Sequence, residues 1–237
     1  MLEIKNFSKT YDGVKKAVND LTLTINDGEI FGFIGHNGAG KTTTIKCSVG
    51  ILPFDSGDIL IDGKSIKDNP IECKKIMAYI PDNPDLYEQL TAIQFLNFIS
   101  DIYEIDKEDR KTRINKYASI FKLEDNLNDL ISSYSHGMKQ KLALISAFIR
   151  EPKLLILDEP FVGLDPKASH DVKELMKELC EKGSSIFFST HVLEVAEKLC
   201  DEIAIIKDGE LVACGKMEDV KGDKSLEDVF LGLVDHE

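Results

Sequence analysis

A glycine-rich segment, GHNGAGKT at residues 35–42, constrains the fold more than any other part of the sequence. It follows an apolar run at residues 30–34 that predicts a buried strand, and it precedes residues 43–50, which predict a helix. Glycines let consecutive backbone N–H groups close around phosphates, Lys41 can reach the β and γ oxygens, and the Thr42 hydroxyl can bind Mg²⁺. The segment therefore predicts a nucleoside triphosphate site. Its residues are Gly35, His36, Asn37, Gly38, Ala39, Gly40, Lys41, Thr42 and Thr43.

The spacing of apolar residues divides the chain into an α/β part and a helical part. Residues 86–150 have the three- and four-residue spacing of helix faces. On both sides of this segment, short apolar runs alternate with helical stretches, which is typical of a parallel sheet with crossover helices. Alternation of apolar residues, at positions 2, 4 and 7 and at positions 21, 23 and 25, predicts antiparallel strands near the N-terminus. One predicted helix face contains Phe95, Phe98, Ile99 and Ile102.

The composition argues against several classes of protein. The longest apolar run, residues 142–149, is far shorter than the roughly 18 residues that cross a bilayer, and the N-terminus lacks the apolar region of a signal peptide. The five cysteines are scattered and never spaced as CxxC, which favours a reducing cytosol over a disulfide framework or a zinc site. A net charge of −13 disfavours binding to the phosphates of nucleic acids. We therefore expect no nucleic-acid partner.

A second acidic motif, LLILDEP at residues 154–160, follows the predicted helical segment. A buried strand that ends in Asp158 places a carboxylate at the carboxyl edge of the sheet, where α/β folds bind ligands. We expect Asp158 to hold Mg²⁺ through a water and Glu159 to polarise the water that attacks the phosphate. Adjacent acids after a strand are more often a helix N-cap. The glycine-rich segment earlier in the chain favours the catalytic interpretation.

The segment SYSHGMKQKL at residues 133–142 resembles the signature of the ABC ATPase family, usually written LSGGQ, and the helix after it. Ser135 and Gly137 match that signature, whereas Tyr134, His136 and Met138 depart from it. The resemblance implies that Ser135, His136 and Gly137 bind the γ-phosphate held by a second ATPase subunit, in a head-to-tail dimer. The alternative is an ordinary serine N-cap, and the position of the segment shortly before LLILDEP favours the signature.

Three further matches extend the resemblance along the chain. Tyr11 is similar to the aromatic residue that stacks on adenine, although a buried core aromatic is an alternative. Asp165, in the segment GLDP, is similar to the residue that communicates across the dimer. His191, after a predicted strand, resembles the family's switch histidine and would contact the γ-phosphate, although a lone histidine there is usually structural.

Asp82 is a departure from the family pattern. The family usually has a glutamine after the strand that enters the helical insert, where it binds Mg²⁺ and responds to the membrane partner; this chain has AYIPDNPDLY at residues 78–87. Aspartate is still an oxygen ligand, but it is charged and shorter by one methylene. We predict that Asp82 reaches Mg²⁺ through a water or from a shifted loop.

The predicted fold is α/β. It has a phosphate-loop NTPase core with a RecA-like parallel sheet, an N-terminal antiparallel β subdomain and an inserted α-helical subdomain. By its resemblance to the family, the chain is expected to form an ABC ATPase domain at residues 1–215 and a short C-terminal tail at residues 216–237. The predicted α/β core comprises residues 1–82 and 153–215, and the predicted helical insert comprises residues 83–152.

The resemblance implies an ATP-hydrolysing subunit of an ABC transporter, with ATP and Mg²⁺ as cofactors. It would act as a homodimer or heterodimer and energise substrate movement, in the direction of export, by a separate polytopic membrane subunit docked near residues 82–103. The expected location is the cytoplasm, peripheral to the inner face of the cell membrane. One alternative is a soluble ABC ATPase that acts on ribosomes or nucleic acid. Another is a small-molecule kinase, which would leave Ser135 and His191 unexplained.

Overall fold

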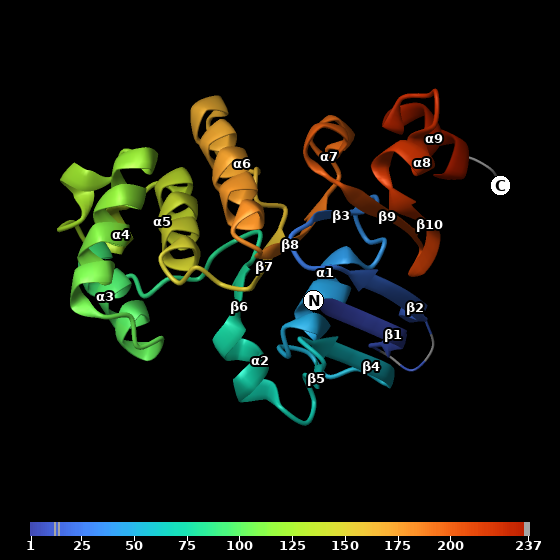
Figure 1. Cartoon of the computed structure of the whole chain (residues 1–237), viewed down its shortest axis with the longest axis horizontal. Helices are drawn as coiled ribbons and strands as arrows, with labels where there is room; N and C mark the ends of the chain where they lie inside the picture. The colour runs from blue at the N-terminus through green and yellow to red at the C-terminus, as the bar shows by residue number, and fades with distance from the viewer. Residues whose placement is uncertain (12, 14, 235–237) are drawn as a thin grey trace.

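A six-stranded sheet forms the centre of the protein in the computed structural model, which describes residues 1–11, 13 and 15–234 (Figure 1). Its strand order is β10-β9-β3-β8-β7-β6, and every neighbouring pair is parallel except the hairpin of β9 and β10. Its inner strands are buried on both faces, which is why their sequences are continuous apolar runs rather than alternating ones. The strands are β3 (Ile30–Ile34), β6 (Met77–Ile80), β7 (Leu154–Asp158), β8 (Ser185–Thr190), β9 (Glu202–Lys207) and β10 (Glu210–Lys216).

The two faces of this sheet bury separate groups of side chains. On β7, Leu154 and Ile156 lie in one hydrophobic cluster, whereas Leu155 and Leu157 lie in the other, as the two-residue period of a strand requires. One face packs against α5 (His136–Phe148), α6 (Pro166–Glu181) and α7 (Leu193–Leu199). The other packs against α1 (Lys41–Ser48) and the N-terminal strands.

The N-terminal strands form a second sheet with the order β2-β1-β4-β5. All its strand pairs are antiparallel, as the alternation in the sequence predicted. The inward side chains of β1, including Leu2, Ile4 and Phe7, share a cluster with Phe31 and Phe33 of the central sheet. The strands are β1 (Leu2–Thr10), β2 (Lys16–Ile25), β4 (Ser56–Ile61) and β5 (Lys64–Ser65). The predicted fold class is therefore confirmed.

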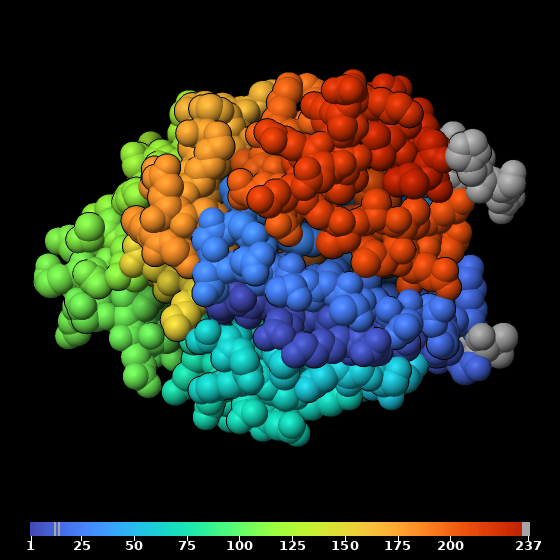
Figure 2. Space-filling view, turned by 45° about the vertical axis from the view of Figure 1, so that its right-hand side comes forward, coloured from blue at the N-terminus to red at the C-terminus, as the bar shows by residue number. Residues whose placement is uncertain are grey.

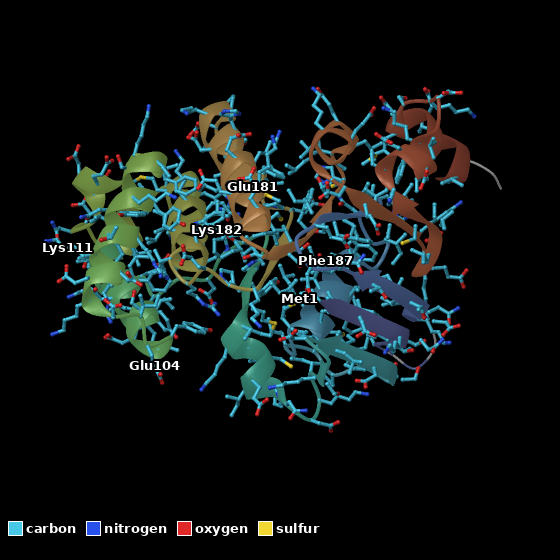
Figure 3. The ribbon with its side chains drawn as sticks, in the orientation of Figure 1. Met1, Glu104, Lys111, Glu181, Lys182 and Phe187 are labelled. Atoms are coloured by element: carbon cyan, nitrogen blue, oxygen red, sulfur yellow. The ribbon has the colours of Figure 1, made fainter. Side chains whose placement is uncertain are left out.

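A group of helices projects from one side of the core, coloured green to yellow in Figures 1 and 2. It contains α3 (Ala92–Ile102), α4 (Lys107–Phe121) and the signature helix α5. Glu104 and Lys111 lie on its outer side, whereas Phe187 lies inside the core (Figure 3). All three helices lie within residues 83–152, the range predicted for the helical insert.

The predicted apolar face of α3 is only partly buried. Phe95 is buried and Ile99 is half-buried, but 42% of Phe98 and 54% of Ile102 are exposed. Phe98 packs edge-on against Tyr87, which is also exposed, with 5.6 Å between ring centroids. Helical spacing therefore predicted the helix correctly, but part of its apolar face is exposed rather than packed against the core.

Two segments were not predicted in detail. The short helix α2 (Pro70–Ile76) leads directly into β6, the edge strand of the central sheet. The C-terminal tail forms α8 (Met217–Lys221), which packs on β9 and β10, and α9 (Leu226–Val234), which packs on α7. Leu226 is fully buried there, and the Glu197 carboxylate accepts hydrogen bonds from the Lys221 ammonium (2.6 Å) and the Leu226 N–H (3.2 Å).

In the described part of the chain, every helix is either too short or too polar to cross a membrane.

Candidate active site

The glycine-rich loop runs from the end of β3 to the first residue of α1, as predicted. A Cβ atom on Gly35 would lie 2.5 Å from the Ile206 carbonyl oxygen, so only glycine fits there. At Gly40, where φ is +110°, a Cβ would lie 2.6 Å from the Ala17 carbonyl oxygen. Gly38 also has a positive φ but has no atom near its missing Cβ, which leaves its backbone open to a ligand. The loop is therefore packed on its inner side and accessible on its outer side.

Lys41 is buried and turned back toward its own loop. Its ammonium donates hydrogen bonds to the carbonyl oxygens of Gly35 (2.6 Å) and His36 (3.2 Å). Its Nζ also lies 3.5 Å from Oε1 of Glu159. The positive charge is thus at the centre of the loop, where the phosphates of a nucleotide would be bound.

Asp158 ends β7 as a fully buried carboxylate. Its Oδ1 accepts a 2.5 Å hydrogen bond from the Ser189 hydroxyl, but among the described residues Oδ2 has no hydrogen-bond donor. Burial raises the pKa of the Asp158 carboxyl, and hydrogen bonds from Ser189 and Thr42 only partly oppose this. An unpartnered, buried oxygen beside Thr42 is suited to a hard cation or to its bound water.

Glu159 lies between Lys41 and His191. Its Oε2 is 3.0 Å from the His191 Nδ1, and its Oε1 makes no hydrogen bond with any described residue despite its proximity to Lys41. The Glu159 φ angle is +49°, an uncommon conformation for a residue with a side chain and one that is found preferentially at functional sites. Its N–H donates to the Ser189 hydroxyl at 3.1 Å, which fixes this turn. Glu159 therefore has one held oxygen and one oxygen available to a ligand or water.

His191 follows β8, and 48% of its side chain is exposed. Its partner is Glu159, which lies beside the glycine-rich loop rather than in the core, and this disfavours a purely structural role for the histidine. Three elements, the loop, the end of β7 and the end of β8, therefore bring Lys41, Glu159 and His191 together.

Tyr11 lies beside the loop and is 63% exposed, so the alternative of a buried core aromatic is wrong. Its hydroxyl lies 3.2 Å from the Thr43 hydroxyl. Tyr11 and Asp82 line the same cavity, of about 340 Å³. The remaining residues that line it are Ala17, Asn37, Gly38, Gly40, Lys41, Thr42, Thr43 and Glu159.

The oxygen donors around this cavity fit Mg²⁺ better than a softer metal, because they are a hydroxyl and carboxylates. Thr42 and Asp82 line the cavity, and Thr42 contacts the buried Asp158. No group of three or more His, Cys, Asp or Glu side chains that could hold a metal occurs in residues 1–11, 13 and 15–234. Mg²⁺ would therefore depend on phosphate oxygens for its remaining ligands, as is usual for this ion.

The predicted signature residues lie apart from the cavity, which none of them lines. Ser135 caps α5, and its hydroxyl accepts a hydrogen bond from the Met138 N–H at 3.3 Å. The GLDP loop packs against this segment, since a Cβ on Gly163 would lie 2.8 Å from the His136 ring. Gly137 approaches the same loop, with a missing Cβ 3.1 Å from the Gly163 carbonyl oxygen.

Asp165 connects the GLDP loop to the signature helix. Its carboxylate caps α6 at the Ala168 N–H (2.9 Å) and contacts the Lys141 ammonium (2.8 Å). These partners, Lys141 first, lower the pKa of Asp165 to about 2. The signature and this loop thus form one surface within the chain.

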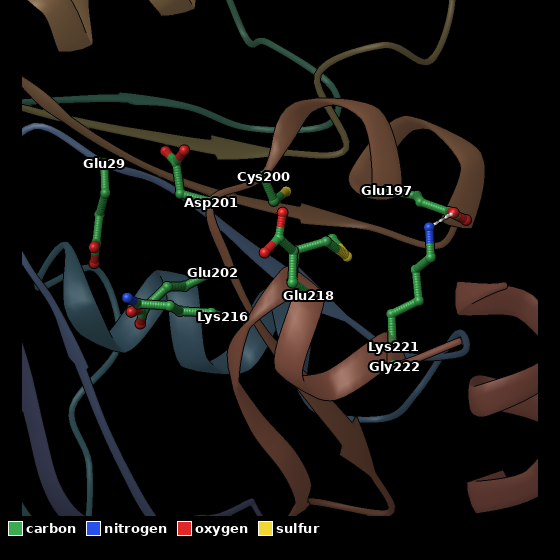
Figure 4. A pocket seen from close by; sticks show the side chains of 10 residues that line it. Glu29, Glu197, Cys200, Asp201, Glu202, Lys216, Glu218, Lys221 and Gly222 are labelled. Atoms are coloured by element: carbon green, nitrogen blue, oxygen red, sulfur yellow. Dashed lines mark hydrogen bonds and ion pairs between the residues drawn. The ribbon is translucent and has the colours of Figure 1, made fainter. Parts of the chain in front are cut away.

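A second cavity, of about 770 Å³, is a separate feature that shares no lining residue with the site (Figure 4). It lies between β9 and the C-terminal tail, and its walls include Glu29, Asp201, Glu202 and Glu218. Its acidic walls make it a poor receptor for phosphates.

Comparison with known proteins identifies the family. The sequence pattern of the family described as ABC transporter matches residues 18–162. The chain belongs to the ABC transporter family. Within that family it is an ATP-binding subunit and an ATPase.

Relatives of this ABC ATPase include two proteins of Bacillus subtilis (strain 168). The ABC-type transporter ATP-binding protein EcsA is 35% identical over 98% of this chain and 96% of its own length. The linearmycin resistance ATP-binding protein LnrL is 36% identical over 93% of this chain and 70% of its own length.

Solved structures support the same assignment. One described as the ATP-binding subunit of an ABC transporter is 37% identical, with a TM-score of 0.94 over 98% of this chain and 99% of that one. The ATP-binding cassette MJ0796, a dimer in a post-hydrolysis state with bound ADP and Pi, is 26% identical, with a TM-score of 0.83 over 92% of this chain and 99% of that one.

Sequence reasoning missed two residues that organise the site of this ABC ATPase. Ser189 holds both the Asp158 carboxylate and the Glu159 N–H, and Lys141 pairs with Asp165. A serine two positions before His191, at the carboxyl end of a buried strand, was the available signal for Ser189. Lys141 gave no signal, because its partner comes from a separate loop.

Replacement of Asp158 by asparagine should stabilise the nucleotide-free ABC ATPase. The raised pKa means that the folded state favours the protonated carboxyl of Asp158 and that ionisation opposes folding. The stability contributed by the protonated group is therefore present at low pH and is lost as the pH rises through the raised pKa. The asparagine side chain would stay neutral and could still accept a hydrogen bond from Ser189. We expect thermal unfolding at pH 8 to shift up by about 2–4 °C, which corresponds to roughly 1 kcal/mol at this chain length.

The same comparison at acidic pH is the control, because protonation of the wild-type carboxylate below its raised pKa should reduce the difference. Scanning calorimetry of both proteins without nucleotide measures it. A lower midpoint for Asp158→Asn at both pH values would contradict this account.

Proposed function

We propose that this ABC ATPase energises the export of a substrate by a separate membrane subunit, through ATP-driven closure of two ATPase subunits and their reopening after hydrolysis. The observation that best supports this proposal is the position of Glu159. Its carboxylate lies between Lys41 and His191 beside the phosphate loop, with one oxygen that has no hydrogen bond to any described residue. A carboxylate so placed can orient a water and accept its proton during attack on the γ-phosphate.

The other residues around the cavity have complementary roles in this proposal. Backbone N–H groups of residues 35–43 and the Lys41 ammonium bind the phosphates, and Tyr11 stacks on the adenine. His191 holds Glu159 through its Nδ1, which leaves the other ring nitrogen for the γ-phosphate. Lys41 exchanges its present carbonyl contacts for phosphate oxygens when ATP binds.

Bound Mg²⁺ would neutralise charge on the β- and γ-phosphates. Thr42 would hold it directly, and Asp158 would hold it through a water because its carboxylate is deeply buried. Asp82 is exposed, and its Oδ1 accepts from the Asn83 N–H at 2.9 Å, so its other oxygen can face the cavity. Asp82 would therefore bind through a water at the cavity edge.

The proposed dimer accounts for signature residues that do not line the nucleotide cavity of their own chain. The cavity holds the phosphate loop, whereas Ser135, His136 and Gly137 lie on another surface, next to the loop of Asp165. In a head-to-tail dimer the signature surface of one subunit would cover the phosphates held by its partner. The dimeric MJ0796 structure supports the association of two ATPase subunits.

Exposed apolar side chains support a docking site for the membrane subunit near residues 82–103. Tyr87, Phe98 and Ile102 are exposed there, and Ile71 of α2 is exposed beside them. Ile71 and Ile102 line one cavity of about 400 Å³ together with Tyr103. Docking at the inner face of the cell membrane would bury these side chains.

The proposed direction of transport rests on two observations. The SHGMKQ form of the signature resembles that of the ATPase subunits of bacterial exporters with separate membrane chains. LnrL, a relative of comparable similarity, is named for resistance to linearmycin. The alternative, a soluble ABC ATPase on ribosomes or nucleic acid, is disfavoured by the net charge of −13.

Co-purification tests the proposed function. We expect the tagged chain, isolated in detergent from its native cells, to retain a polytopic membrane protein, and Ile102→Glu to reduce that yield at least about tenfold by burying an unpaired charge at the interface. Leu231→Glu, at an exposed apolar position of α9, is the matched control. Recovery of ribosomes or nucleic acid without a membrane protein would contradict the proposal.

A further inference from the structure

Arg150 joins three elements that meet at the base of the helical group. It lies two residues after α5, and its guanidinium stacks on the Tyr103 ring at the end of α3, with its Cζ 3.4 Å from the ring centroid. The same guanidinium donates through Nη2 to the carbonyl oxygens of Lys74 (3.3 Å) and Met77. Arg150 therefore connects α5, α3 and the junction between α2 and β6.

The environment of this arginine is unusual for a simple surface contact. Burial lowers the pKa of Arg150 to about 10, and its Nε has no hydrogen-bond acceptor among the described residues. Its side-chain partners in the described part of the chain are two carbonyl oxygens and a ring, so no carboxylate compensates its burial. A cation held in this way requires its neighbours to stay in place, because few alternative acceptors are available.

The strand that Arg150 holds ends at the candidate metal site. Met77 is the first of the four residues of β6, and Asp82 follows the last of them, Ile80, by two positions. Because β6 is the edge strand, β7 pairs with it on one side only. Pairing in register with β7, whose last residue is Asp158, brings the end of β6 toward that carboxylate. A contact that fixes Met77 thus also limits where Asp82 can lie.

We propose that Arg150 is a positioning residue for Asp82: by linking the Met77 carbonyl to the Tyr103 ring it fixes the start of β6, and so limits where Asp82 lies relative to bound Mg²⁺. This inference rests on the metal role proposed above for Asp82. Tyr103 also lines the cavity that contains Ile71 and Ile102, so a partner docked there would contact the ring on which Arg150 stacks. The guanidinium is then a direct physical link between the docking face and the nucleotide site.

Binding of the fluorescent analogue mant-ATP at increasing Mg²⁺ concentrations tests this role without relying on hydrolysis. Arg150→Met should raise the Mg²⁺ concentration for half-maximal binding about 3- to 10-fold, the usual size of coupling through a packed contact. Affinity for mant-ATP in EDTA should change less than about twofold, because Lys41 and the loop are untouched. Arg150→Lys, which keeps the charge and a donor, should recover part of the Mg²⁺ response.

Arg113→Met is the matched control. Arg113 also donates to a backbone carbonyl, that of Ile149 at 3.0 Å, but it has ion pairs and does not contact β6. The Arg113→Met variant should leave the Mg²⁺ response of mant-ATP binding unchanged. Hydrogen exchange at residues 77–82 provides a readout independent of nucleotide, and it should accelerate in Arg150→Met and not in Arg113→Met.

The double variant Asp82→Asn/Arg150→Met separates positioning from general destabilisation. If Arg150 acts through Asp82, the double variant should match Asp82→Asn alone. Equal shifts in Arg150→Met and Arg113→Met, or additive shifts in the double variant, would overturn the inference. If Asp82→Asn has no effect on the Mg²⁺ response, the proposed metal role of Asp82 fails and this inference fails with it. If Asp82→Asn has an effect and Arg150→Met has none, only the inference about Arg150 fails.

Discussion

Glu159→Gln should abolish steady-state ATP hydrolysis while ATP binding is retained. The variant keeps the size of the side chain and an acceptor for His191, but it cannot take a proton from water. Loss of a general base usually lowers a rate by about 10²–10⁴-fold, so we expect kcat to fall at least a hundredfold. Because the phosphate loop is unchanged, the ATP-bound dimer should accumulate and be visible as a doubled mass by light scattering.

Glu174→Gln is a suitable control for this experiment, since Glu174 is an exposed carboxylate on α6 that pairs only with the nearby Lys177 among the described residues. Its kcat should equal that of the wild type. Hydrolysis by Glu159→Gln at more than about a tenth of the wild-type rate would remove Glu159 from the role of base. Loss of ATP binding would instead assign Glu159 to nucleotide binding.

Lys41→Ala should weaken ATP binding about 10- to 100-fold. A hydrogen bond to a charged group contributes roughly 1.5–3 kcal/mol, and each 1.4 kcal/mol is a tenfold change in affinity. Lys41 already lies inside the loop, held by the Gly35 and His36 carbonyls, so its charge is placed before nucleotide arrives. Isothermal titration with ATP measures the change.

Lys46→Ala, on the same helix, is the matched control because it removes the same charge outside the cavity. Its ATP affinity should stay within about twofold of the wild type, as expected for a long-range charge in physiological salt. An unchanged affinity in Lys41→Ala would refute the assignment of the phosphate loop.

Much of the site could be predicted because its residues lie in short segments with fixed local geometry. Gly38 and Gly40 have positive φ angles, which favour glycine, and Asp158 follows four consecutive apolar residues of β7. These constraints are local, so the sequence is sufficient to recognise them. The antiparallel N-terminal sheet was predictable for the same reason, because the alternation of apolar residues within each of its strands is local.

The features that escaped prediction depend on distant parts of the chain. Phe98 and Ile102 follow the spacing of a buried helix face, but no other element of the described chain covers them. Arg150 contacts Met77, 73 positions away, and no motif marks either residue. Sequence patterns indicate the elements, whereas these contacts depend on how the helical group sits on the core.

The division of the site between two subunits is the central claim, and mixing two inactive variants tests it most directly. Lys41→Ala and Ser135→Ala should each hydrolyse ATP at close to background rates. In a one-to-one mixture, half of the randomly formed dimers would contain one site with both residues intact, so roughly a quarter of the wild-type rate should return. A mixture no more active than the two separate variants would contradict the account.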